Sequence, residues 1–234
     1  MIGINNTVKK ISIFGDSNSI PRSEYGVELI TEKDTYGYKI SDNFKCAEII
    51  NYGSASNRSD KVDKFIGKNN IKPDDFDLII LNIGICDCAP RLFSKIESKI
   101  LQYLPNRIRG FVIRAAKSNS LFLTRYIPKY YVSKNNFEKN INNILSKFNS
   151  GLVVIVGISN VSDELAGSRC NYRSQIKSYN NILYKRAIYK GQYFIDMYNN
   201  DNSYLLHDGL HISIKAHDYI YHEIENILKE KKYG

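Results

Sequence analysis

The chain has 234 residues, of which 43% are hydrophobic and 24% charged, a composition typical of folded globular proteins and not of disordered segments. Its longest apolar runs, Phe76–Ile85 and Leu152–Ile158, fall well short of the ~20 residues of a membrane-spanning helix. The net charge of +9 would suit an anionic substrate or a nucleic acid. The lysines are scattered, however, with one tight cluster at residues 229–232, and no nucleic-acid-binding motif is present. We therefore expect neither a membrane span nor a nucleic-acid partner.

The cysteines and the N-terminus bear on cofactors and location. Four cysteines, at positions 46, 86, 88 and 170, lack the paired C-x-x-C spacing of common zinc sites. The first residues contain two lysines but no apolar segment before the first predicted strand, which is unlike a signal peptide. We expect a cytoplasmic protein, a setting in which a disulfide framework is rare. The sequence predicts neither a metal nor an organic cofactor.

In chain order, the first predicted element is a strand at Lys10–Phe14 that runs into the polar turn GDSNS. A second strand at Ala47–Asn51 ends in the small-residue turn YGSAS and is followed by a helix over 59–67. The clearest buried strand is Phe76–Ile83, bounded by PDD before it and by Gly84 after it. Each of the three strands thus ends in small, polar residues.

Residues 91–118 have mainly helical spacing, with Pro105 starting a new element, and a tyrosine-rich connection over 124–132 follows. The segment 91–133 is longer than a minimal crossover, which indicates a helical cap over a pocket or a subunit interface. Tyr126, Tyr130 and Tyr131 could stack on a sugar ring or form a packed loop or oligomer contact. The remaining predicted elements are a helix over 135–148, a strand over 152–157, a helix over 172–190, a strand over 193–197 and a helix over 213–231.

Strands that alternate with helices predict crossover connections and a parallel sheet. We expect one domain over residues 1–234, an α/β fold built as a three-layer α/β/α sandwich around a five-stranded, mainly parallel sheet. In such sheets, reactive groups gather at the carboxyl ends of the strands, where the connecting loops lie.

Four polar clusters occupy these predicted positions. GDSNS, YGSAS and GICDC follow the first three strands, and HDGLHIS lies in the loop after the fifth. A serine hydroxyl becomes a nucleophile when a base, usually a histidine oriented by a carboxylate, takes its proton. The clusters supply the residue types that acyl transfer at a serine requires.

In this order, GDSNS, YGS, GICD and DGLH resemble the four sequence blocks of the SGNH, or GDSL-like, hydrolase family. The resemblance extends from Gly15 to His211 and implies a flavodoxin-like three-layer fold. Matched residue by residue, it implies that Ser17 is the nucleophile, His211 the general base and Asp208 the carboxylate that orients it. The backbone N–H groups of Ser17 and Gly53 would donate to the oxyanion.

The third block departs from the family pattern. The family has G-x-N-D, in which an asparagine side chain donates to the oxyanion, whereas this chain has GICD with Cys86 at that position. A thiol is a weak donor. Loss of one oxyanion donor costs roughly 3 kcal/mol, or ~10²- to 10³-fold in rate. The resemblance thus implies a weakened oxyanion hole, unless Asn82 or Asn57 supplies the missing donor.

The strings GICDCAPR and SIPR are similar to those of family members associated with bacterial surface polysaccharides. The resemblance implies a serine esterase acting on an acyl ester, in the first instance acetyl, of a carbohydrate or another small ester. Acyl transfer to a glycan through the same site is one alternative. A non-catalytic module that binds a glycan or a protein partner is the other, and Cys86 is its main support.

Each candidate residue also has a structural interpretation. Ser17 could cap the helical turn that follows it. Arg22 and Arg91 could bind a carboxylate or phosphate of the substrate, or form a salt bridge with Asp16, Asp87 or a backbone carbonyl. Asn57 and Asp87 are further candidates for substrate contact.

Overall fold

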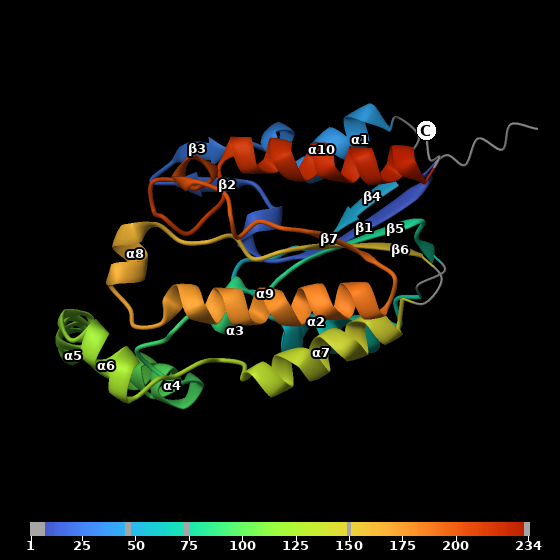
Figure 1. Cartoon of the computed structure of the whole chain (residues 1–234). Coiled ribbons are helices and arrows are strands. Elements are labelled where there is room, and N and C mark those ends of the chain that lie inside the picture. Colours follow the sequence, from blue (N-terminus) through green and yellow to red (C-terminus); the bar gives the residue numbers. More distant parts are fainter. Residues whose placement is uncertain (1–7, 45–47, 73–74, 149–150, 232–234) are drawn as a thin grey trace, which may run out of the picture.

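The computed structural model of the chain describes residues 8–44, 48–72, 75–148 and 151–231 (Figure 1). Ala47, the first residue of the second predicted strand, and Lys232, the last of the basic cluster, lie outside these residues. Five strands form one sheet in the order β4-β1-β5-β6-β7, and every neighbouring pair is parallel. The strands are β1 (Lys10–Gly15), β4 (Glu48–Asn51), β5 (Leu78–Asn82), β6 (Leu152–Val156) and β7 (Tyr193–Ile195). The predicted five-stranded parallel sheet is confirmed.

Helices cover both faces of this sheet, as Figure 1 shows. Helices α1 (Tyr36–Asn43) and α10 (Ile214–Glu230) pack on one face. Helices α2 (Ser59–Lys68), α7 (Lys134–Ser146) and α9 (Tyr172–Tyr189) pack on the other. All five residues of β5 are buried, as expected for a central parallel strand with helices on both sides. The predicted three-layer sandwich is therefore confirmed.

The strand order places the GDSNS turn at the point where the order of the parallel strands reverses. From β1 the chain passes to β4 on one side, and then across to β5 on the other side of β1. In such flavodoxin-like sheets, the crevice where the order reverses lies at the carboxyl ends of the strands and binds ligands. The GDSNS turn directly follows β1, so it lies at this crevice.

Helix α1 and several elements beside the crevice were not predicted. The strands β2 (Arg22–Glu24) and β3 (Val27–Ile30) form an antiparallel hairpin directly after the GDSNS turn. Its loop residues Tyr25 and Gly26 have φ angles of 51° and 81°, the left-handed values that tight hairpin turns require. The Asn-Gly or Asp-Gly pair that usually marks such a turn in a sequence is replaced here by Tyr-Gly, and tyrosine seldom adopts this conformation. The hairpin could therefore not be recognised from the sequence. The short helix α8 (Asp163–Gly167) is another such element.

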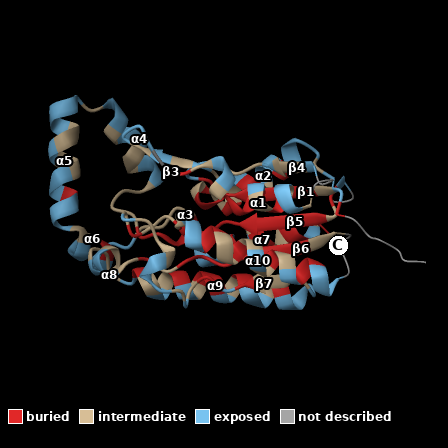
Figure 2. Ribbon diagram, turned by 90° about the horizontal axis from the view of Figure 1, so that it is seen from above, coloured by how far each residue is buried: buried red, intermediate tan, exposed pale blue. Residues whose placement is uncertain are grey.

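The long segment between β5 and α7 contains the helices α4 (Lys95–Tyr103), α5 (Asn106–Ser118) and α6 (Ser120–Tyr126). Pro105 is the N-cap of α5, which agrees with its predicted place at the start of a new element. Figure 2 shows α5 at one end of the molecule, away from the sheet and with most of its residues exposed or half-buried. In the part of the chain that the structure describes, none of the helices has the length and apolarity needed to cross a membrane.

Candidate active site

The structure brings Ser17, Asp208 and His211 together at the crevice. Ser17 opens a short 3-10 turn (Ser17–Ser19) after β1, and its Oγ lies 3.0 Å from His211 Nε2. The opposite ring nitrogen, Nδ1, lies 2.5 Å from Asp208 Oδ2. The three groups thus form one hydrogen-bonded chain from hydroxyl to imidazole to carboxylate, the order that nucleophile activation requires.

The D-x-x-H spacing works because the Asp208 carboxylate organises its own loop. Its Oδ1 accepts the backbone N–H groups of Leu210 (3.0 Å) and His211 (2.9 Å). Burial alone would raise the pKa of Asp208, but these bonds and the His211 side chain outweigh it and lower the pKa below its ordinary value. The ionised carboxylate therefore accepts Nδ1–H, which leaves the Nε2 lone pair directed at Ser17.

Ser17 does not cap the turn that it begins. The N-cap is Asp16, whose Oδ1 accepts the Asn18 N–H at 3.0 Å. The Asn18 side chain accepts the Ile212 N–H at 3.2 Å, which links this turn to the loop that carries His211. The capping interpretation of Ser17 is wrong, because its hydroxyl has His211 as its partner instead.

Arg22 reaches the same group from the β2–β3 hairpin. Its Nη1 donates to His211 Nε2 at 3.1 Å, and its Nη2 donates to Asp208 Oδ2 at 3.1 Å. The salt bridge therefore forms with Asp208, not with Asp16 or Asp87. The Ser17 hydroxyl and an Arg22 N–H share one nitrogen lone pair, so Arg22 is part of the hydrogen-bonded group itself.

A pocket of about 340 Å³ opens beside Ser17 and His211, a volume in the range of small-molecule sites. Side chains of both apolar and basic character form its walls. The lining residues are Ser17, Arg22, Ala55, Ser56, Ile85, Cys86, Ala89, Arg91, Leu165, Arg169, Tyr172, Leu210 and His211. Sequence reasoning missed Leu165, Arg169 and Tyr172, which belong to loops and helix ends without a motif, and it did not single out Ser56 within the YGSAS turn.

The expectation for Gly53 needs correction. The Gly53 N–H donates to Asn51 Oδ1 at 2.8 Å, so this donor is already bonded. Three residues further along the same turn, Ser56 lines the pocket together with Ser17 and has a φ angle of 58°. Among the described residues, neither the Ala55 N–H nor the Ser56 N–H has a hydrogen-bond acceptor. The free donors of this turn are therefore at Ala55 and Ser56, which both line the pocket.

Solved structures with this architecture include hydrolases. A lipase/acylhydrolase from Enterococcus faecalis is 16% identical with a TM-score of 0.63, over 95% of this chain and 96% of that one. An acetylxylan esterase from Geobacillus stearothermophilus is 13% identical with a TM-score of 0.60, over 98% and 96%. A member of the lipolytic G-D-S-L family from Veillonella parvula is 14% identical with a TM-score of 0.56, over 94% and 98%. The chain has the SGNH hydrolase fold.

Sequence comparison gives no comparable match. No protein-family model matches the chain, and no curated protein matches it significantly. The fold is thus shared with the three structures named above, while the sequence identity to each of them is 16% or less.

Cys86 lies in the short helix α3 (Ile85–Cys88) and lines the pocket at the position where the SGNH pattern has asparagine. Burial, with the charge of Asp16 acting in the same direction, raises the pKa of the Cys86 thiol to about 11. At neutral pH the group is a protonated thiol, which is a weak donor and a poor nucleophile. No set of three or more His, Cys, Asp or Glu side chains that could hold a metal ion occurs within the described ranges.

The other polar candidates are bonded inside the protein. Asn57 donates through Nδ2 to the carbonyl that ends β1 at 3.0 Å, and Asn82 donates to the Tyr36 hydroxyl at 3.3 Å. The Asp87 carboxylate accepts both the N–H and the hydroxyl of Ser59, the latter at 2.6 Å. The expected substrate contacts of Asn57 and Asp87 are therefore corrected: both tie loops together, and neither lines the pocket beside Ser17, which Asn82 does not line either.

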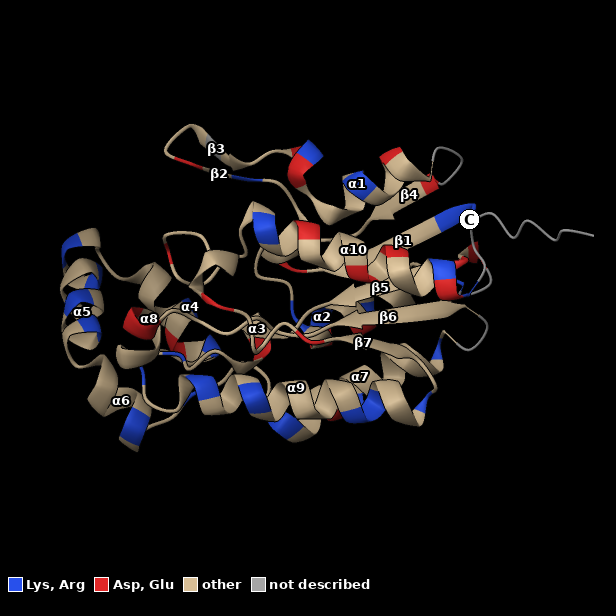
Figure 3. Ribbon diagram, turned by 45° about the horizontal axis from the view of Figure 1, so that its top comes forward, with Lys and Arg blue, Asp and Glu red and all other residues tan. Residues whose placement is uncertain are grey.

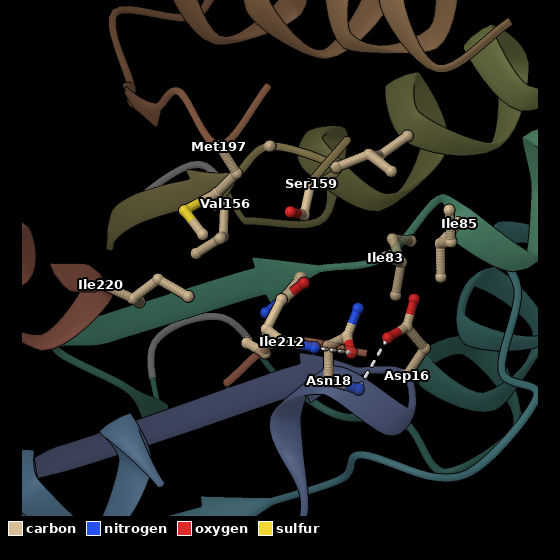
Figure 4. Close-up of a pocket in the computed structure, with 12 residues that line it drawn as sticks. Asp16, Asn18, Ile83, Ile85, Val156, Ser159, Met197, Ile212 and Ile220 are labelled. Atoms are coloured by element: carbon tan, nitrogen blue, oxygen red, sulfur yellow. Dashed lines mark hydrogen bonds between the residues drawn. The ribbon is translucent and has the colours of Figure 1, made fainter. Parts of the chain in front are cut away.

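A small cavity of about 10 Å³ lies beneath the GDSNS turn (Figure 4). Asp16 and Asn18 face it from the turn, joined by their hydrogen bond, and apolar residues such as Ile83 and Val156 form much of its wall. Burial raises the pKa of Asp16 to about 7, the Asn18 N–H opposes this, and the charge of Asp87 adds to it. Ionised Asp16 is therefore costly in the folded protein.

We expect Asp16→Asn to become progressively more stable than the wild type as pH rises from about 4 to 7. In this window the unfolded chain loses the Asp16 proton and the folded protein keeps it, so ionisation favours unfolding of the wild type by up to ~1.4 kcal/mol per pH unit. Above pH 7 the difference is constant. Urea denaturation at pH 5, 6, 7 and 8 measures it. Exposed Asp42→Asn is the matched control, and a stability difference for Asp16→Asn that does not vary with pH would contradict the prediction.

Proposed function

We propose that the protein is a serine esterase that removes an acyl group, in the first instance acetyl, from a carbohydrate through an acyl-enzyme on Ser17. The observation that supports this best is the chain from Ser17 Oγ to His211 Nε2 (3.0 Å) and from His211 Nδ1 to Asp208 (2.5 Å), at the wall of a pocket. Three groups in this order can turn a hydroxyl into a nucleophile.

In the first half-reaction, His211 Nε2 takes the Ser17 proton while Oγ attacks the ester carbonyl carbon. The tetrahedral intermediate collapses, the sugar hydroxyl leaves with the proton from His211, and the acyl group stays on Ser17. In the second half, His211 takes a proton from water, the resulting hydroxide attacks the acyl carbon, and Ser17 recovers its proton as the free acid departs. Asp208 stays ionised and stabilises the imidazolium in both halves.

The oxyanion of both intermediates needs donors. The candidates in the pocket wall are the backbone N–H groups of Ser17, Ala55 and Ser56 and the side chain of Cys86. The backbone groups are amide donors, while Cys86 has a thiol in place of an amide. We infer that the site retains strong donors from Ser17 and from the Ala55–Ser56 turn, and that the weak thiol lowers its rate.

The carbohydrate part of the proposal comes from similarity. Among the solved structures with this fold are acetylxylan esterases, including one described as an acetyl-xylooligosaccharide esterase from Geobacillus. The GICDCAPR and SIPR strings add the similarity to proteins associated with surface polysaccharides. Arg91 of the first string and Arg22 of the second both line the pocket.

Transfer of the acyl group to a sugar hydroxyl is the alternative that uses the same acyl-enzyme. The two reactions differ only in whether water or a sugar reaches the acylated Ser17. Product analysis with and without a sugar acceptor distinguishes them, because a transferase forms a new ester only when the acceptor is present.

A fluorophosphonate probe tests the proposed function directly. We expect intact-mass measurement to show one adduct, peptide mapping to place it on Ser17, and His211→Ala to abolish it, since the hydroxyl then has no base. Absence of an adduct after prolonged exposure would overturn the esterase proposal and favour a module that only binds a glycan or a protein.

A further inference from the structure

The arginines of the protein fall into two groups. Arginine side chains that are partly buried are costly unless an anion compensates their charge. Four of them have a carboxylate partner: Arg22 with Asp208, Arg58 with Asp60, Arg173 with Asp163 and Arg186 with Glu138. Within the described residues, three partly buried arginines have none, and these are Arg91, Arg109 and Arg169.

All three uncompensated arginines lie at the same place. Arg91 and Arg169 line the pocket that contains Ser17, and both also line an adjoining pocket of about 370 Å³. Arg109 and Lys117 of α5 line this second pocket, and neither pocket has an Asp or Glu among its described lining residues. Figure 3 shows basic residues along α5 and no acidic ones. The two pockets share Arg91 and Arg169, and together we call them the basic trough, of which only the first pocket is lined by Ser17.

Arg91 and Arg169 are fixed in position but keep most of their donors. Arg91 Nη2 donates to the Cys86 carbonyl at 3.1 Å, its guanidinium lies 4.6 Å from the centre of the Tyr131 ring, and its buried Nε has no partner. Arg169 Nη1 donates to the Pro90 carbonyl at 2.5 Å. A guanidinium has five N–H donors, so each side chain can still make a two-pronged contact.

The two cations also repel each other. Burial lowers the pKa of Arg169, and the charge of Arg91 acts in the same direction. Two guanidinium groups that stay charged at neutral pH are held close enough to interact, with no carboxylate of the described residues between them. An anion placed between them would remove this repulsion and compensate both charges.

We propose that Arg91 and Arg169 bind an anionic group of the substrate, a carboxylate or a phosphate, so that the preferred ester is one on an acidic saccharide. This inference rests on the proposed function and specifies its substrate class. The planar fork of arginine matches both anions. The ester to be cleaved lies at Ser17, and the anionic group lies further along the same trough.

Matched substrates test the proposal. The three probes are an O-acetylated methyl glucuronoside, an O-acetylated glucose 6-phosphate and an O-acetylated methyl glucoside, which is neutral. We expect kcat/KM for at least one acidic probe to exceed that for the neutral probe by about 10- to 100-fold, the effect of hydrogen bonds to a charged group. Comparison of the first two probes identifies the anion as carboxylate or phosphate.

Variants then locate the site. We expect Arg169→Gln and Arg91→Gln each to lower the acidic-to-neutral ratio about 10-fold, and Arg169→Lys to retain part of it. Because the ratio is taken within one protein, loss of folded enzyme does not affect it. Arg114→Gln on the exposed side of α5 is the matched loss of one positive charge and should leave the ratio unchanged.

Equal rates for acidic and neutral probes, or a ratio that Arg169→Gln and Arg114→Gln lower alike, would overturn the inference. Failure of the proposed function has a different signature, namely no adduct on Ser17 and no hydrolysis of any probe. In that case, calorimetric titration with glucuronate and glucose 6-phosphate decides: binding that Arg169→Gln removes and Arg114→Gln keeps supports the anion site, and no binding overturns it.

Discussion

Replacing Ser17 with alanine is expected to lower kcat for ester hydrolysis by about 10⁴- to 10⁶-fold, the loss found when a serine nucleophile is removed. The Ser17 hydroxyl contacts His211 Nε2, whereas the turn itself is capped by Asp16. Removing one oxygen therefore takes away the nucleophile without removing the bonds that shape the turn. Hydrolysis of p-nitrophenyl acetate, followed in parallel with thermal unfolding, measures both consequences.

The matched control for this variant is Ser174→Ala on the exposed side of α9. Its hydroxyl donates to the Asn171 carbonyl, far in sequence from the GDSNS turn, and we expect its activity to equal that of the wild type. Should Ser17→Ala keep most of its activity, Ser17 would not be the nucleophile. A variant that fails to fold would be recognised by its unfolding curve, and the residue that carries the fluorophosphonate adduct in the wild type would then identify the nucleophile.

Replacing Cys86 with asparagine is expected to raise kcat, by up to ~10²- to 10³-fold, the contribution of one oxyanion donor. Burial keeps the Cys86 thiol protonated at neutral pH, with a pKa raised to about 11, so the wild type presents only a weak S–H donor. An amide N–H would stabilise charge that develops in the transition state, so kcat should rise with little change in KM. Steady-state kinetics on one acetyl ester provides the test.

The control for this gain is Cys86→Ala, which removes the thiol without adding a donor and is expected to give no increase. An asparagine variant with unchanged kcat would show that another group already occupies the donor position. If kcat fell in both variants, the thiol itself would be contributing to the wild-type rate.

The sequence patterns predicted the sheet and the polar clusters at its edge, and the resemblance to the SGNH family implied the roles of Ser17, Asp208 and His211. A buried parallel strand needs an unbroken apolar run, as in β5, and the chain must turn in small, polar residues where such a strand ends. Asp208 and His211 are only three residues apart, so one turn suffices to bring the carboxylate to the imidazole. Their place beside Ser17 followed from the expectation that parallel strands present their carboxyl ends at one edge.

Residues whose role depends on distant contacts could not be predicted in this way. Arg22 donates to Asp208 across 186 positions of sequence. It does so from the β2–β3 hairpin, which the sequence did not predict. Arg169 donates to the Pro90 carbonyl across 79 positions of sequence, and its side chain lines the pocket.

Hydrogen bonds within the protein determine which of the predicted polar groups remain available to a substrate. The family pattern offered Gly53 as a donor, but its N–H is taken by the Asn51 side chain, and the unbonded N–H groups of that turn belong to Ala55 and Ser56. Asn57 and Asp87 are likewise bonded to the end of β1 and to Ser59. A polar group pairs with whatever the fold brings near it. Sequence therefore determines which donors and acceptors exist, and tertiary packing decides which remain free for a substrate.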